Sequence, residues 1–153
     1  MASTENLKTT PPPLICLVAL LIGLALNAIW PLVSIPDHVR YIAGSLLIFG
    51  SLLAMPSILV KFRRMKTTFD VRKSPSAFIA DGLYRFCRNP SYVALVLLFI
   101  GLGFVLSILR LLIWLVPVAV IIDRYVILEE ERRLELAFGD QYRDYKAPVK
   151  PWL

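Results

Sequence analysis

Two groups of charged residues border the apolar runs of this chain. The first lies in residues 82–92, GLYRFCRNPSY, directly before an apolar run, and the second is the acidic triplet at residues 129–131 that follows this run. Guanidinium groups bind carboxylates and phosphates through paired hydrogen bonds, whereas carboxylates accept hydrogen bonds from ammonium and hydroxyl groups. Opposite charges at two apolar borders therefore predict a binding site for a charged small molecule.

The first group also predicts where a helix begins. Asn89 is a favoured N-cap residue and Pro90 a favoured first helical residue, so we expect a helix to start here. The free N–H groups of a helix N-terminus attract anions, and Arg85 and Arg88 add two guanidinium groups just before it. The alternative is that Asn89 and Pro90 only cap the helix while both arginines reach lipid phosphates.

Asp123 and Arg124 lie near the end of the same apolar run. Ionisable side chains within a membrane segment need a partner or a wet cavity, and they are functional candidates. In a continuous α-helix Arg124 and Glu131 share one face about 10 Å apart, a span that suits a zwitterionic ligand. The alternatives are internal ion pairs for Asp123 and Arg124 and a solvated helix face for the acidic triplet.

Composition indicates a membrane environment. The 153 residues are 58% hydrophobic with a mean hydropathy of +0.68, which is too apolar for a soluble domain of this length. A hydrocarbon core of about 30 Å requires about 20 apolar residues per helix. The spans expected on this basis are 14–35, 41–60, 92–109 and 111–128, with Arg110 dividing the last two into a hairpin. Pro56 and Pro117 are positions where the second and fourth helices can kink.

The predicted fold is an all-α integral membrane protein with four transmembrane helices and a cytoplasmic cap of short helices. The expected segments are a flexible tail (1–13), a first helix pair (14–60), a basic segment (61–91), a helix hairpin (92–128) and C-terminal helices (129–153). Lysines and arginines concentrate in the basic and C-terminal segments, so the positive-inside rule places both termini and the site in the cytoplasm. We expect a multi-pass protein of a bacterial inner membrane.

The charge pattern also limits the partners. The net charge of +6 indicates attraction to anionic lipid headgroups, since no soluble basic domain remains to hold nucleic acid. The sequence has no cluster of cysteine and histidine residues, so it predicts no metal site. Residues 65–80 mix basic and apolar side chains, so we expect them to lie along the membrane interface as a lid over the site.

The order and spacing of the motifs resemble a known family. The chain is similar to the isoprenylcysteine carboxyl methyltransferases and phospholipid methyltransferases in Gly82, Tyr84, Arg85, Arg88, Asn89, Pro90, Tyr92, Arg124 and the stretch 130–145. The resemblance covers roughly residues 66–153. It implies an integral membrane enzyme that binds S-adenosylmethionine at the cytoplasmic face and takes a lipophilic acceptor from the bilayer.

The resemblance also implies roles for individual residues. The implied cofactor-binding residues are Tyr84, Arg85, Arg88, Asn89, Pro90, Tyr92, Glu130 and Glu131. Arg124 and Tyr92 are the implied catalytic residues, with Arg124 meeting the acceptor or the carboxylate of the cofactor. Two positions depart from the family pattern, because Asn89 stands where the best-known members have His and Leu83 where many have Pro.

The departure at Asn89 bears on the acceptor. Asparagine does not titrate near neutral pH, and the single histidine, His38, is expected on the opposite side of the membrane. Without an imidazole base, the site favours an acceptor that arrives ionised, such as a carboxylate, because it needs positioning and desolvation more than deprotonation. A protonated amine would need Glu130, Glu131 or a tyrosine as its base. The sequence therefore favours methylation of an anionic oxygen or sulfur on a lipophilic molecule.

Two other functions remain open. The first is a membrane reductase that uses a nicotinamide cofactor, since sterol reductases resemble this family in their C-terminal half. The second is a non-catalytic multi-pass protein that stabilises a partner through its helices. Binding of the demethylated cofactor or of a nicotinamide nucleotide would distinguish these functions.

Overall fold

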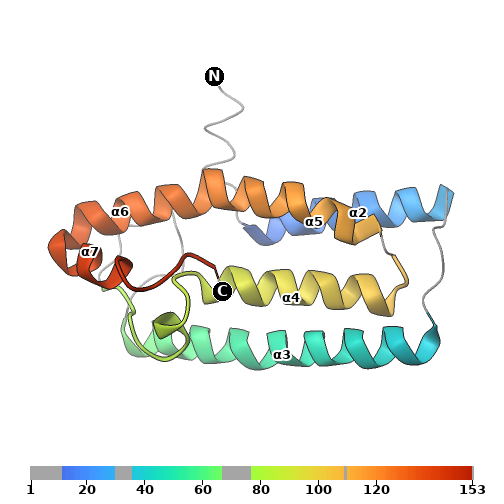
Figure 1. The fold of residues 1–153 in the computed structure, drawn as a ribbon, viewed down its shortest axis with the longest axis horizontal. Helices are drawn as coiled ribbons and strands as arrows, with labels where there is room; N and C mark the ends of the chain where they lie inside the picture. Colours follow the sequence, from blue (N-terminus) through green and yellow to red (C-terminus); the bar gives the residue numbers. More distant parts are fainter. Residues whose placement is uncertain (1–11, 30–35, 67–76, 109, 153) are drawn as a thin grey trace, which may run out of the picture.

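The computed structural model describes residues 12–29, 36–66, 77–108 and 110–152. Regular structure within these ranges is helical throughout, in the order α2 (Pro12–Ile29), α3 (Asp37–Arg64), the 3₁₀ turn η1 (Gly82–Arg85), α4 (Pro90–Val105), α5 (Arg110–Ile121), the π-helical segment η2 (Ile122–Ile127), α6 (Leu128–Phe138) and α7 (Asp140–Lys146). Figure 1 shows α3 and α4 side by side, with α5, η2 and α6 forming one long helical rod along them. The predicted all-α class is confirmed for the described residues.

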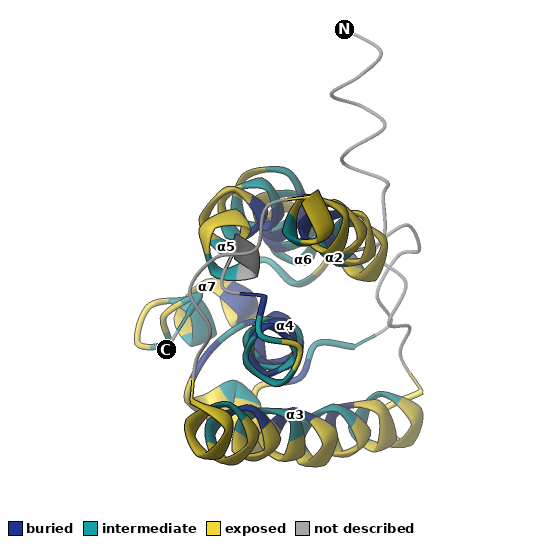
Figure 2. Ribbon diagram, turned by 90° about the vertical axis from the view of Figure 1, so that its right-hand side faces the viewer, coloured by how far each residue is buried: buried dark blue, intermediate teal, exposed yellow. Residues whose placement is uncertain are grey.

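Helix α4 lies at the centre of the packing. It contacts α3 on one side and α2 and α5 on the other, and Figure 2 shows it between the α3 layer and the remaining helices. The hydrophobic core joins Tyr92 and Phe99 of α4 to Ile122, Val126 and Ile127 of η2. The N-terminal end of α4 is thereby held close to the rod, where the two predicted motifs meet.

Helix α3 is the one described helix that is long and apolar enough to cross a membrane. Its 28 residues correspond to about 42 Å, compared with a hydrocarbon core of about 30 Å. Only 17% of its most apolar window is buried inside the structure, and Ile42, Leu46 and Phe49 are 63%, 66% and 61% exposed. Exposing an apolar surface of this extent to water is unfavourable, so α3 is a candidate transmembrane helix.

The other three predicted spans are shorter in the structure. Helices α2 and α4 are apolar but have 18 and 16 residues, and α5 has 12 residues before the π-helical segment begins. The first predicted span reaches residue 35, whereas α2 ends at Ile29 and residues 30–35 lie outside the described part of the chain. Length and composition thus support one span, and four spans remain a prediction.

Charged residues extend α3 beyond its predicted range of 41–60. The helix includes Asp37 in its first turn and Lys61, Arg63 and Arg64 in its last turn. Acidic side chains near the N-terminus of a helix and basic side chains near its C-terminus stabilise the helix by interacting favourably with its dipole. The helix therefore continues past the apolar residues at both ends. The predicted division at Arg110 is confirmed, because α5 begins at this residue.

The rod departs from α-helical geometry at η2. Pro117 lies inside α5, whereas the irregular segment is Ile122–Ile127, after which the N–H of Leu128 binds the carbonyl of Asp123 in the i+5 pattern of a π-helix. One extra residue in a turn rotates everything that follows by about 100° relative to a continuous α-helix. This rotation decides which charged side chains of α6 face α4.

Gly44 and Gly101 let α3 and α4 approach closely. A Cβ at Gly101 would lie 2.9 Å from the carbonyl oxygen of Gly44 and 2.8 Å from Cγ1 of Ile48. We predict that Gly101→Ala forces the helices apart and lowers the free energy of unfolding by about 1–3 kcal/mol, the usual cost of overpacking. Gly50→Ala is the control on α3, because nothing lies within 4 Å of its added Cβ. Thermal unfolding in a neutral detergent compares the two variants, and equal midpoints would contradict the close packing.

Candidate functional site

The two predicted charged motifs meet at one end of the molecule. Residues 82–92 form η1 and the start of α4, and the acidic triplet lies in the first turn of α6. Figure 1 shows these segments, together with α7, at the end of the molecule where α3 also finishes. The sequence therefore predicts correctly that the basic and acidic motifs converge.

Glu131 is the charged centre of the site. Arg88 Nε lies 3.1 Å from Glu131 Oε1, and Lys146 Nζ lies 2.9 Å from Glu131 Oε2. The side chains of Arg88 and Glu131 are only 10% and 6% exposed. Since water is largely excluded, each of these charges depends on the others for its stabilisation.

Glu130 has a different environment from its neighbour. The Tyr92 hydroxyl, which is buried, donates a 2.9 Å hydrogen bond to Glu130 Oε2. Burial raises the pKa of Glu130 above its ordinary value, the hydrogen bond from Tyr92 opposes this shift, and the charge of Glu131 adds to it. One carboxylate is thus neutralised by two cations, while the other is held by a neutral hydroxyl.

Asn89 is the N-cap residue of α4 and Pro90 is its first residue, as the sequence predicts. The backbone carbonyl of Asn89 accepts hydrogen bonds from the first turn, but its side chain does not cap the helix. Asn89 Nδ2 instead donates a 3.0 Å hydrogen bond to the carbonyl of Pro151. The N–H of Arg88 binds the carbonyl of Lys150 at 2.9 Å, so the C-terminal segment is attached along the basic motif.

Tyr84 and Arg85 lie in η1, on the side of the site nearest to α3. The Tyr145 hydroxyl donates a 2.8 Å hydrogen bond to the carbonyl of Tyr84, which holds η1 against α7. Burial raises the pKa of the Tyr84 hydroxyl, and the nearby charge of Glu130 raises it further. Arg85 is exposed, and no ion pair between described residues includes it.

Arg124 is separate from this cluster. Its side chain is 71% exposed and its Nε lies 3.9 Å from Asp123 Oδ2, whereas Glu131 is buried. The prediction that Arg124 and Glu131 share one face is wrong, because it assumes a continuous α-helix, whereas Arg124 lies within the π-helical segment η2. A role for Arg124 in meeting the acceptor or the cofactor stays a prediction.

Two residues of the cluster are missed by the sequence reasoning. Lys146 binds Glu131, and Trp152 Nε1 donates a 2.9 Å hydrogen bond to Asp123 Oδ1. Lys146 follows the buried Tyr142 by four residues, so helix periodicity places both on one face and could have identified it. The contact of Trp152 depends on the path of the chain after α7, for which the sequence carries no periodic signal.

The predicted lid at 65–80 lies mostly outside the described residues, because 67–76 are not described. In its described part, Phe78 packs against Phe138, Tyr142 and Tyr145 with ring centroids 5.1, 5.8 and 5.8 Å away. Residue 78 therefore covers α6 and α7, on the side of the cluster that Lys146 occupies.

The cluster has the donors and acceptors that a zwitterionic ligand requires. Arg88 Nε and Glu131 Oε1 are buried and face each other, yet among the described residues neither has an aligned hydrogen-bond partner. Arg88 and Lys146 can bind a carboxylate, while Glu130 and Glu131 can bind an ammonium or hydroxyl groups. The described residues contain no group of side chains arranged to hold a metal ion.

Comparison with known proteins finds one family. The family model described as phospholipid methyltransferase matches residues 39–141, more than half of the chain. The matched range runs from the first turn of α3 to the start of α7, and it includes Arg88, Tyr92, Glu130 and Glu131. Neither the search of curated proteins nor that of solved structures finds a match.

We predict that breaking the buried ion pair costs far more stability than breaking an exposed pair. Arg88→Ala leaves Glu131 without one of its two cations and should lower the free energy of unfolding by about 3–5 kcal/mol. Arg143→Ala is the control, because Arg143 and Asp140 are 65% and 90% exposed and such pairs contribute at most about 1 kcal/mol. Chemical unfolding in detergent measures both variants, and a similar loss in each would refute the central place of Arg88.

Glu130 and Glu135 should give opposite pH dependences of stability. Burial raises the pKa of Glu130, so the native state holds this proton more tightly than the unfolded chain and stability falls as pH rises above the ordinary glutamate value. The hydrogen bond from Lys146 lowers the pKa of Glu135, so its contribution is present above that value and is lost as pH falls through the lowered pKa.

Glutamine variants test this contrast. At neutral pH Glu130→Gln should raise the free energy of unfolding and Glu135→Gln should lower it, and both differences should vanish in acid. Unfolding free energies measured from acid to neutral pH give the comparison. A destabilised Glu130→Gln protein at neutral pH would show that the burial of this carboxylate is not costly.

Proposed function

The chain belongs to the phospholipid methyltransferase family, as its motifs predict, and from this membership we propose that it transfers a methyl group from S-adenosylmethionine to a lipophilic acceptor in the membrane. The observation that carries the proposal is the direct contact between the two motifs. Arg88 meets Glu131, and Tyr92 meets Glu130. All four residues lie within the matched range.

The cluster can exchange its internal ion pairs for contacts with a zwitterion. A carboxylate on the ligand would pair with Arg88 and Lys146, and an ammonium would pair with Glu131. Each buried charge then replaces one partner by another, so binding leaves no charge without compensation. S-Adenosylmethionine has such a zwitterionic end, and its sulfonium supplies a methyl group that an acceptor can attack directly.

The remaining residues of the motif have supporting roles in this proposal. Tyr92 fixes the carboxylate of Glu130, which is then oriented to accept hydrogen bonds from hydroxyl groups of the cofactor. Asn89 acts as a structural donor, because its amide holds the carbonyl of Pro151. An amide donor is sufficient for this contact, which explains how asparagine can stand where the best-known family members have histidine.

We propose an acceptor that is already ionised, with a carboxylate as the favoured group. His38 lies in the first turn of α3, at the opposite end of this helix from the site. The last turn of α3 lies beside the site, where Lys61 forms an ion pair with Asp81. No histidine therefore supplies a base at the cluster. An anionic oxygen would form the new bond to the methyl carbon with its own electron pair while the bond from that carbon to sulfur breaks and leaves S-adenosylhomocysteine, so no proton has to move. The bilayer supplies the acceptor, and the cluster faces the cytoplasm in this proposal.

Titration with S-adenosylhomocysteine tests the cofactor site. We predict binding by the purified protein that weakens about 10-fold or more in Glu130→Gln, since hydrogen bonds to a charged group contribute about 1.5–3 kcal/mol. Glu129→Gln is the matched control, because Glu129 pairs with Arg133 of the same helix and not with the cluster. A folded protein that binds a nicotinamide nucleotide instead would favour a reductase, and one that binds neither would favour a non-catalytic role.

Turnover completes this test. Purified protein with radiolabelled S-adenosylmethionine should methylate a long-chain carboxylate or thiol in preference to a long-chain amine. Turnover of the amine alone would contradict the proposed acceptor while leaving the methyltransferase assignment in place.

A further inference from the structure

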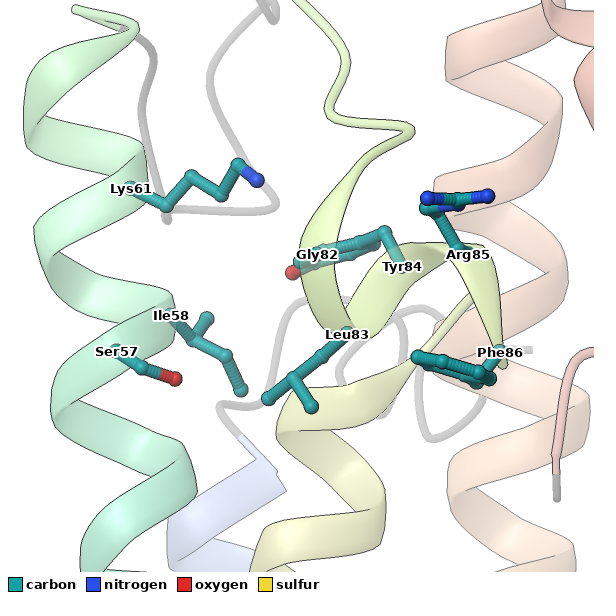
Figure 3. Close-up of a pocket in the computed structure, with 8 residues that line it drawn as sticks. All are labelled: Ser57, Ile58, Lys61, Gly82, Leu83, Tyr84, Arg85 and Phe86. Carbon is teal, nitrogen blue, oxygen red and sulfur yellow. The ribbon is translucent and has the colours of Figure 1, made fainter.

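A second feature lies beside the cluster, between the last turns of α3 and η1. A cavity of about 440 Å³ is lined by Ser57, Ile58, Lys61, Gly82, Leu83, Tyr84, Arg85 and Phe86. Figure 3 shows Ser57, Ile58 and Lys61 pointing from α3 toward Leu83 and Tyr84. The contacts that define the Arg88–Glu131 cluster involve none of these α3 residues.

The lining of the cavity changes from charged to apolar along α3. In Figure 3 the Lys61 ammonium and the Arg85 guanidinium lie above Tyr84, one on each side of it, whereas Ile58 and Leu83 lie below. Leu83 and Phe86 are 40% and 73% exposed although both are apolar. Ile58 is buried on the inward side of α3, and it lies nearer than Lys61 to the apolar middle of this candidate transmembrane helix. A molecule with an anionic head and an alkyl chain has the complementary arrangement.

The cationic end is accessible to an incoming anion. Lys61 forms an ion pair with Asp81, but the Asp81 side chain is 74% exposed while that of Lys61 is 25% exposed. Such an exposed carboxylate loses little when it returns to water, so an anion can take its place on Lys61. Arg85 is exposed and takes part in no ion pair within the described ranges, which leaves its donors available as well.

Gly82 keeps this end of the cavity open. Its φ of +64° is a conformation that other residues rarely adopt, and a Cβ at this position would lie 2.9 Å from Lys61 Nζ. The backbone thus passes close to the ammonium without a side chain to displace it.

Tyr84 connects the cavity to the cluster. It lines the cavity, and its carbonyl accepts the hydrogen bond from Tyr145 of α7, the helix that also supplies Lys146 to Glu131. The charge of Glu130 adds to the raised pKa of its hydroxyl, so Tyr84 belongs both to the cavity and to the surroundings of the cluster. A group bound against Tyr84 would lie next to the proposed cofactor site.

We propose that this cavity binds the anionic head of a membrane amphiphile, a phosphate or carboxylate on an alkyl chain, and that this amphiphile is the methyl acceptor. The head binds Lys61 and Arg85, and the chain passes Ile58 and Leu83 toward the bilayer. The acceptor role rests on the proposed function, whereas the binding site rests on the cavity and its charges.

Binding of dodecyl phosphate to the purified chain in maltoside micelles tests the site. We expect dodecyl phosphate to bind at least 10-fold more tightly than dodecanol, dodecyltrimethylammonium or inorganic phosphate. Lys61→Gln should weaken the binding of dodecyl phosphate about 10-fold, and Leu83→Trp, which fills the apolar end, should weaken it similarly. Arg64→Gln is the control, because it removes one positive charge from an exposed position in the last turn of α3, the turn that also contains Lys61.

Several results would overturn the inference. An equal loss in Arg64→Gln would show general attraction of anions to a basic surface, and tight binding of inorganic phosphate would show a free-anion site without a chain. S-Adenosylhomocysteine binding serves as the folding control and should be unchanged in Lys61→Gln. If the wild type binds dodecyl phosphate but not S-adenosylhomocysteine, the acceptor role fails together with the proposed function. If it binds S-adenosylhomocysteine while Lys61→Gln and Leu83→Trp leave dodecyl phosphate binding unchanged, the cavity assignment fails alone.

Discussion

The buried carboxylate of Glu131 is the constraint on which the functional end of this protein depends. A charge that is 6% exposed needs compensation, and Arg88 from the start of α4 and Lys146 from α7 provide it. These contacts join segments that are far apart in the sequence. The electrostatic requirement of one side chain therefore positions the N-terminus of α4, the start of α6 and the end of α7 relative to one another.

The polar contacts around this centre continue outward in a connected set. Lys150 and Pro151 bind Arg88 and Asn89 through their carbonyl groups, and Trp152 reaches Asp123 in the π-helical segment. The C-terminal segment thus connects the basic motif to the π-helical segment. The charges of the cluster are therefore linked to several segments at once, whereas the cavity lined by Tyr84 is bordered by the ion pair of Lys61 with the exposed Asp81.

The sequence predicts the parts of this structure that follow from local chemistry. Asn89 and Pro90 mark the start of α4, and Arg110 starts α5. Motif spacing also predicts that Arg88 and Glu131 belong to one site. The register of the rod could not be predicted, because a π-helical segment depends on packing of Ile122, Val126 and Ile127 in the core. The extent of α3 and the contacts of Lys146 and Trp152 likewise depend on charges and chain paths outside any apolar pattern.

The π-helical segment determines which charged side chain of the rod faces the inside of the protein. In the observed winding, the carboxylate of Glu131 turns toward α4 and the guanidinium of Arg124 faces outward. The same residues wound as a regular α-helix would turn α6 by about 100° about its axis and move the acidic side chains off the basic motif. The single additional residue in that turn therefore changes the register of the rod. With this register, the residues up to η2 pack by apolar contacts, and the start of α6 packs by charge.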